Sequence, residues 1–251
     1  SVVVHKQVWK MLNYCGDDYK KEIEKVDVWG YRSLPLKREF EENTGVVPKR
    51  HFMCYSGIPV HFLSQKEMCN ITSPINRFVY VGSFIQRKYP EKVLKGILES
   101  SVAYDFQLDY VGDGINRNLI ENIIVDNNLE KKVTLHGFVS REQVPSFINK
   151  AQCFIMISEE ETFGLVYLEA MSMGCITIAS RNEGMEGIIE DGVNGFLCKA
   201  GDEKELAEII DKINTMPLKK LQEISEKAHQ TAIQLTDEKV AKYYIDQITN
   251  C

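Results

Sequence analysis

With 251 residues, 26% of them charged, and a formal net charge of −6, the chain lacks the basic balance that a nucleic-acid partner requires. It also lacks an apolar run of the ~18 residues that span a membrane, and its first residues lack the apolar core of a secretory signal. Seven cysteines without CxxC spacing indicate reduced, buried thiols. We therefore expect a cytoplasmic protein without a transmembrane segment, and peripheral contact with the inner face of a membrane stays open.

The first 70 residues do not follow the pattern of the rest of the chain. Residues 17–25 predict an amphipathic helix, 26–29 a short strand, 34–43 a second helix and 51–55 a further strand. A loop-like segment at 57–75 then leads into the remainder of the sequence.

Strand and helix patterns alternate from residue 77 onward. Apolar or β-branched runs predict strands at 77–81, 106–111, 132–136, 153–157, 175–179 and 195–198. Helical patterns occupy 90–100, 115–128, 140–150, 164–173, 185–190, 202–214, 217–234 and 237–248. Such alternation implies βαβ units with right-handed crossovers. The sequence therefore predicts an α/β fold with a Rossmann-like parallel sheet and helices on both faces.

Small residues follow most of the predicted strands, namely Gly82, Gly112, Gly137, Ser158 and Ser180. In a parallel sheet these positions share one edge, where a ligand can closely approach the backbone.

One junction between a strand and a helix carries the strongest signal for a binding site. Glu161 and Glu169 bracket it, and Gly164 opens the helix. The main-chain N–H groups of Leu165 and Val166 would then lie at the positive end of the helix dipole. This arrangement predicts an anion site at the sheet edge.

The Glu-x7-Glu spacing of this junction, with its embedded Phe-Gly-Leu, resembles the signature of the group 1 (family 4) retaining glycosyltransferases. These enzymes have the GT-B fold and use nucleotide-sugar donors. Four further segments resemble family motifs in the same order: 81–88, 110–114, 133–139 and 190–197. Because the five motifs cover roughly residues 76–235, the chain is identified as a member of that family.

The resemblance implies how the chain is divided. Residues 1–56 would be a remnant of the N-terminal acceptor domain, and 57–75 the linker. Residues 76–235 would form the nucleotide-sugar (donor) binding domain. The last segment, 236–251, would be a C-terminal helix that packs back on the remnant.

Cleavage of the sugar–phosphate bond leaves negative charge on the departing diphosphate, which the protein must stabilise. The resemblance assigns this role to Lys88, with Arg87 beside it. Without the resemblance, these two residues would be interpreted as ordinary surface charges. Ser83 stands where the family usually has arginine, which predicts weaker diphosphate binding. Phe163 belongs to the embedded motif of the donor site. No Asp-x-Asp cluster occurs, so we expect neither a required metal nor another cofactor.

The resemblance also assigns the remaining parts of the donor. Glu169 would hold the ribose hydroxyls. Glu161 would face the transferred sugar, either as a nucleophile or as electrostatic support, and the sequence leaves both roles open.

Two segments would contact the nucleobase in the family. These are the turn with Gly112 and Asp113, and the segment with Phe138 and Val139. Main-chain groups of Val139 would read a base edge, whereas Phe138 as an aromatic residue is expected to pack in the core.

The sequence thus predicts the donor-binding part of a retaining hexosyltransferase that acts in polysaccharide or glycoconjugate biosynthesis. Its partners would be a nucleotide-diphosphate sugar and a sugar, lipid-linked or glycan acceptor, and we expect the isolated chain to be inactive. A nucleotide-sugar epimerase of the same fold and a non-catalytic nucleotide-binding partner subunit remain as alternatives.

Overall fold

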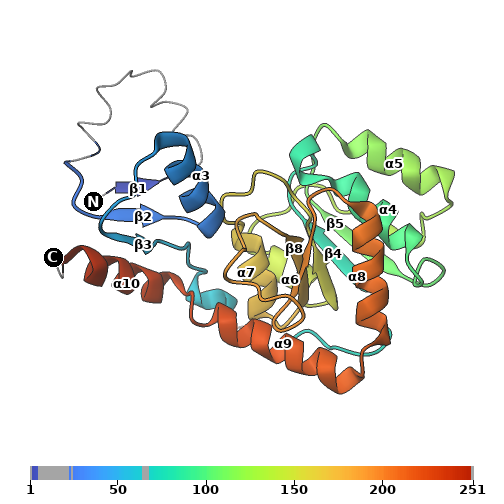
Figure 1. Cartoon of the computed structure of the whole chain (residues 1–251). Coiled ribbons are helices and arrows are strands. Elements are labelled where there is room, and N and C mark those ends of the chain that lie inside the picture. The colour runs from blue at the N-terminus through green and yellow to red at the C-terminus, as the bar shows by residue number, and fades with distance from the viewer. Residues whose placement is uncertain (1, 5–22, 24, 64–67, 250–251) are drawn as a thin grey trace.

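The computed structural model describes residues 2–4, 23, 25–63 and 68–249. It contains two separate parallel sheets (Figure 1). The smaller one has the order β1 (Val2–Val4), β2 (Trp29–Tyr31), β3 (His51–Met53). The larger one consists of β4 (Arg77–Val81), β5 (Gln107–Val111), β6 (Val133–Leu135), β7 (Cys153–Ile155), β8 (Ile176–Ser180) and β9 (Phe196–Cys198).

The strands of the larger sheet lie in the order β6-β5-β4-β7-β8-β9, and all neighbours are parallel. The order reverses between β4 and β7, which is the topological switch point of a doubly wound sheet. Ligands of such folds bind outside the carboxyl ends of the strands at this point. The predicted α/β fold with a Rossmann-like sheet is confirmed.

Helices cover both faces of the larger sheet (Figure 1). On one face, α4 (Pro90–Glu99) packs against α5 (Arg117–Asp126) and α8 (Glu203–Thr215). On the other face, α7 (Leu165–Ser172) packs against α6 (Val144–Ile148) and α9 (Leu218–Ala232). Asp202 caps α8, because its side chain accepts a hydrogen bond from the Glu205 N–H at 3.1 Å.

Helix α7 is buried between the sheet and α9, which explains why it is apolar on all sides. Leu168, Ala170 and Met171 are fully buried. Tyr167 fixes the helix to the end of β7, since its hydroxyl donates to the Met156 carbonyl at 2.8 Å. Gly174 follows the helix in the left-handed conformation, with φ of 70°. The start of α7 is thereby held at the switch point.

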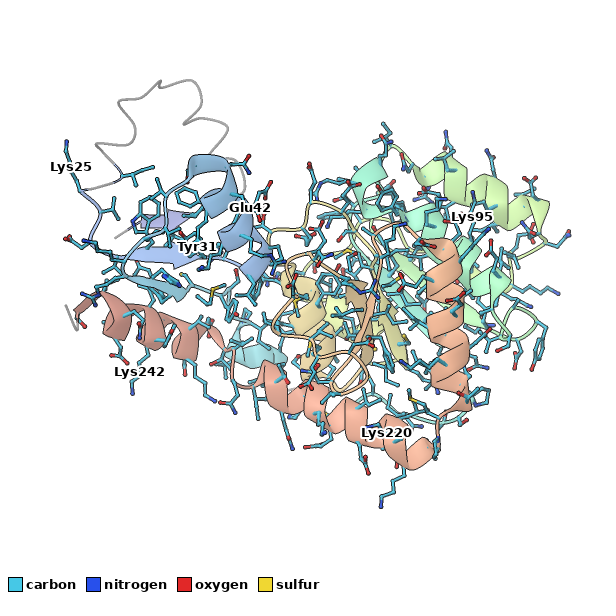
Figure 2. All side chains as sticks on the ribbon, in the orientation of Figure 1. Lys25, Tyr31, Glu42, Lys95, Lys220 and Lys242 are labelled. Atoms are coloured by element: carbon cyan, nitrogen blue, oxygen red, sulfur yellow. The ribbon has the colours of Figure 1, made fainter. Side chains whose placement is uncertain are left out.

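The smaller sheet has its own hydrophobic cluster. Helix α3 (Leu34–Thr44) lies on one side of it and contributes Phe40, whose ring centroid is 5.1 Å from that of Trp29 and 5.9 Å from that of Tyr31. Figure 2 shows Tyr31 between α3 and the strands, where it is fully buried. Ser33 caps this helix by accepting from the Leu36 N–H at 3.4 Å.

Helix α10 (Asp237–Thr249) returns to the smaller sheet on the side opposite α3 (Figure 1). The ring of Phe52 on β3 lies 6.0 Å from that of Tyr243 and 5.7 Å from that of Tyr244. Tyr243 keeps 45% of its surface exposed, so α10 is covered in part. The residue limits assigned to each part of the chain stay predictions.

Three of the predicted elements differ from the structure. The strand expected at 26–29 lies at Trp29–Tyr31, and the helix expected at 140–150 is shortened to Val144–Ile148. Residues 185–190 form turns instead of a helix, because Gly187 adopts a φ of 83°. The helix expected at 17–25 lies mostly outside the described residues. Within the described part of the chain, none of the helices has the length and apolarity needed to cross a bilayer.

Candidate functional site

A cavity of about 530 Å³ lies at the switch point of the larger sheet. We call it the main cavity. The residues that line it come from the end of β4 and the loop after it, the segment before α6, the loop after β7, the first two turns of α7 and the smaller part of the chain: Arg32, Ser56, Val81, Gly82, Ser83, Lys88, Arg141, Met156, 161–166 and Glu169. The structure therefore brings together Ser83, Lys88, Glu161, Phe163, Gly164, Leu165, Val166 and Glu169, as the sequence predicted.

Glycines allow the loops after β4 and β5 to approach each other closely. A Cβ atom on Gly112, which has a φ of 140°, would lie 2.0 Å from the Gly82 carbonyl oxygen. The Gly112 N–H donates to the Gly137 carbonyl at 2.8 Å. A side chain at Gly112 would therefore push apart the backbone segments that border the cavity.

Lys88 lies at the edge of the main cavity, at the end of the short 3₁₀ helix Gln86–Lys88. Its Nζ is 3.8 Å from Glu161 Oε2, and only 16% of its side chain is exposed. Burial lowers the pKa of Lys88; Glu161 opposes this effect, whereas Arg87 adds to it. Arg87 is more exposed and lies 4.0 Å from the same carboxylate oxygen, outside the lining of the cavity. Of these two neighbouring cations, Lys88 is therefore the one that lines the cavity.

Glu161 belongs to a loop that another carboxylate holds in place. The Glu161 N–H donates to Glu183 Oε2 at 2.7 Å, and the Glu160 N–H donates to Glu183 Oε1 at 3.0 Å. Glu160 has a positive φ of 55°, so these bonds stabilise an uncommon conformation. Glu161 Oε2 is buried and accepts no hydrogen bond from any described residue, since 3.8 Å to Lys88 is too long for one.

Glu183 is thus a positioning residue that the sequence did not single out. Replacing Glu183 with alanine is expected to lower the free energy of unfolding by about 1–2 kcal/mol, because two main-chain donors lose a charged acceptor. The midpoint of thermal unfolding should fall by roughly 2–8 °C. Thermal unfolding of the variant, compared with Glu226→Ala on the exposed face of α9, checks this. Equal midpoints for the two variants would contradict the supporting role of Glu183.

The N-terminus of α7 faces the main cavity. Gly164 precedes the helix with a φ of 84°, and Leu165 and Val166 line the cavity with it. Their N–H groups lie in the first turn, where a helix offers no acceptors of its own. Phe163 is buried, and its backbone packs on Gly184, where a Cβ atom would lie 2.5 Å from the Phe163 Cα.

Glu169 projects from the second turn of α7, and its side chain is only 7% exposed. Arg141 Nη2 donates to Glu169 Oε1 at 2.7 Å. The Arg141 guanidinium carbon lies 5.9 Å from the ring centroid of Phe62. The sequence analysis missed Arg141, although its place two residues after the motif at 133–139 was a usable signal.

A second cavity of about 280 Å³ adjoins the main one. The two share Val81, Gly82, Ser83 and Arg141 in their linings, and the second adds Val111, Gly112, Asp113, Phe138, Val139 and Val144. All four residues predicted to contact a nucleobase are therefore brought together there.

One of these residues, Phe138, differs from expectation. Phe138 does not pack in the core; it is 88% exposed, because Gly137 turns the chain outward with a φ of 70° after β6. The Asp113 carboxylate accepts hydrogen bonds from the Gly114 N–H at 2.7 Å and from Arg117 at 3.2 Å. Asp113 therefore shapes its turn.

A third cavity, also about 280 Å³, separates α3 from the loops that follow β7 and β8. It shares Glu161 and Thr162 with the main cavity. Arg38 of α3 donates two hydrogen bonds of 2.7 Å to Glu186 and so joins the smaller part of the chain to the larger one. Glu161 consequently lies where the main and third cavities meet.

The family described as glycosyl transferases group 1 matches residues 66–231 of this chain. An uncharacterized glycosyltransferase of Methanocaldococcus jannaschii is 31% identical over 186 residues, which are 74% of this chain and 49% of that protein. The alpha-D-kanosaminyltransferase of Streptomyces kanamyceticus is 30% identical over 136 residues, or 54% of this chain and 35% of that protein. The chain therefore spans half or less of the length of these relatives.

Solved structures agree with the fold. The Anabaena protein HepE, crystallised with UDP and glucose, superimposes on this chain with a TM-score of 0.74 at 20% identity. The match covers 90% of this chain and 64% of the HepE chain. A lipopolysaccharide outer core galactosyltransferase gives a TM-score of 0.76, also at 20% identity, over 93% of this chain and 65% of the galactosyltransferase chain. These neighbours confirm the expected GT-B type of α/β fold. The chain belongs to the group 1 glycosyltransferase family.

Proposed function

We propose that this chain is the donor-binding part of a retaining hexosyltransferase, which transfers a sugar from a nucleotide-diphosphate sugar to an acceptor hydroxyl. The observation that carries the proposal is the main cavity itself. A partly buried lysine, a helix N-terminus and two glutamates line one space at the switch point, and the second cavity adjoins it. The spatial order of these groups corresponds to the order of the sugar, diphosphate, ribose and base in a nucleotide sugar.

The diphosphate would lie between Lys88 and the start of α7. Negative charge increases on this group as the sugar leaves, and a lysine and the N–H groups of Leu165 and Val166 supply the complementary charge. A bound phosphate would also compensate for the burial of Lys88, since an anion favours the charged form of an amine. We infer no metal or other cofactor for this step.

The nucleoside and the sugar would lie on opposite sides of the diphosphate. Glu169 would accept hydrogen bonds from the ribose hydroxyls, with the base in the second cavity between Asp113, Phe138 and Val139. The sugar would lie beside Glu161, at the boundary with the third cavity, where an acceptor can approach it. Curated relatives in polysaccharide and glycoconjugate biosynthesis, such as a lipopolysaccharide core glycosyltransferase of Rhizobium meliloti, support a pathway of that kind.

We expect the 251-residue chain to bind a nucleoside diphosphate with a dissociation constant on the order of 10–1000 μM, about −4 to −7 kcal/mol. The affinity is modest because most contacts come from one side of the cleft. Thermal-shift and calorimetric titrations with UDP, GDP and ADP test this, with UDP first because HepE of Anabaena was crystallised with it. Addition of EDTA should leave the affinity unchanged.

The same titration separates the proposal from its alternatives. A purely structural partner subunit should show no shift with any of the three nucleotides at millimolar concentration, and that result would refute the proposal. An epimerase would bind a nucleotide sugar and convert it without an acceptor, which product analysis detects.

A further inference from the structure

Arg141 is placed differently from the other cations of the site. Of the described residues that line the main cavity, Arg32, Lys88 and Arg141 are basic, and Arg141 alone also lines the second cavity. It therefore lies at the boundary between the space proposed for the diphosphate and the space proposed for the nucleoside. Ser83, which is polar but uncharged, is common to both linings as well.

In the structure, the Arg141 guanidinium neutralises Glu169. A carboxylate that is 7% exposed needs a partner, because an unpaired buried charge is costly. The 2.7 Å bond from Nη2 provides that partner. This bond uses only Nη2 of a guanidinium that has five N–H donors. The remaining N–H groups of Arg141 can therefore donate to a second acceptor.

Arg141 is also free to change partner. Its side chain is 52% exposed, and its backbone belongs to the turn that precedes α6. Glu169, in contrast, is fixed on a buried helix. An incoming anion can therefore attract the exposed guanidinium without any movement of α7.

We propose that Arg141 is a diphosphate-binding residue, which in the ligand-free protein forms an ion pair with Glu169. This inference rests on the proposed function. The ribose hydroxyls of an incoming nucleotide would take over the hydrogen bonds to Glu169, and the guanidinium would turn to the adjacent phosphates. A planar guanidinium matches phosphate oxygens with two parallel hydrogen bonds. Arg141 would thus supply the second positive charge that Ser83 does not.

The inference makes an unusual prediction about Glu169. Pyrophosphate carries no ribose and cannot replace Arg141 on Glu169, so it must compete with that carboxylate for the guanidinium. Removing Glu169 ends the competition. Pyrophosphate should therefore bind the Glu169→Ala variant roughly 3- to 10-fold more tightly than the unaltered chain, by the population-shift argument.

Isothermal titration of the 251-residue chain with UDP, pyrophosphate and uridine tests the inference. Arg141→Ala should weaken UDP and pyrophosphate roughly 10-fold each, the lower end of the loss expected for a charge-assisted bond. Uridine binding should not weaken. Arg141→Lys should recover only part of the affinity that Arg141→Ala loses for both anions, because lysine retains the charge but lacks the planar pair of donors. In the double variant Arg141→Ala/Glu169→Ala, the gain for pyrophosphate should vanish.

Arg181→Ala is a matched control. Arg181 is 48% exposed and forms a 2.7 Å ion pair with Glu205, but it does not line the main or the second cavity. It should leave all three affinities unchanged, and circular dichroism shows whether each variant is folded.

The outcomes separate the inference from the proposed function. If Lys88→Ala weakens pyrophosphate but Arg141→Ala and Glu169→Ala leave it unchanged, Arg141 only supports Glu169 and the inference is wrong. If Arg141→Ala does not fold, tighter pyrophosphate binding by Glu169→Ala still supports the inference, and unchanged binding overturns it. If the unaltered chain binds neither UDP nor pyrophosphate, the proposed function fails and the inference fails with it.

Discussion

UDP is expected to bind Glu169→Ala about 10- to 150-fold more weakly than the unaltered chain, while pyrophosphate binding is not weakened. The loss corresponds to roughly 1.5–3 kcal/mol, the cost of removing a hydrogen bond to a charged group. Glu169 is buried on a fixed helix beside the cavity. Glu161, the other carboxylate among the described residues that line the cavity, lies beside Lys88 on the side proposed for the sugar. Calorimetric titration of the variant with both ligands checks the prediction.

Lys88→Ala provides the complementary measurement. Lys88 faces the space proposed for the diphosphate, so its loss should weaken UDP and pyrophosphate by similar factors. Glu226→Ala, on the exposed face of α9, controls for a general effect of removing a carboxylate. If Glu169→Ala weakened pyrophosphate as strongly as UDP, the assignment of Glu169 to the ribose would be wrong.

The backbone of the larger sheet was predictable because its signals are local. The strand at 77–81 is the same in sequence and structure, since an apolar run there ends at a glycine. The junction around Gly164 was also predictable, because a left-handed residue before a helix favours glycine. These features fix where chain segments lie, and they brought Lys88, Glu161 and Glu169 to one cavity.

Side-chain partners could not be predicted in the same way. Arg141 and Glu169 are 28 residues apart and meet only through the packing of α6 on α7. Glu183 holds the Glu161 loop from the segment after β8, where the sequence pattern indicated a helix nearby. Phe138 has the composition of a core residue but follows a left-handed glycine that turns it outward. Tertiary packing decided each of these cases.

We expect the 251-residue chain alone to transfer sugar at least about 1,000-fold more slowly than a longer form that carries a complete acceptor domain. Transfer requires an acceptor hydroxyl within ~3–3.5 Å of the anomeric carbon, and such positioning accounts for several kcal/mol of the barrier. In the described residues, the third cavity beside Glu161 is bordered on the acceptor side mainly by α3 and by Ser33 before it. One helix cannot both orient an acceptor and exclude water from the cleft.

The partly covered face of α10 agrees with this expectation. Tyr243 and Ile245 remain 45% and 54% exposed although the helix contacts β3, so the smaller sheet leaves part of the apolar surface of α10 uncovered. A transfer assay with UDP-sugars and a panel of lipid-linked and free glycan acceptors, run on both forms with UDP binding matched, measures the ratio. Comparable rates would mean that the acceptor site is complete within these residues, and the third cavity would then be its location.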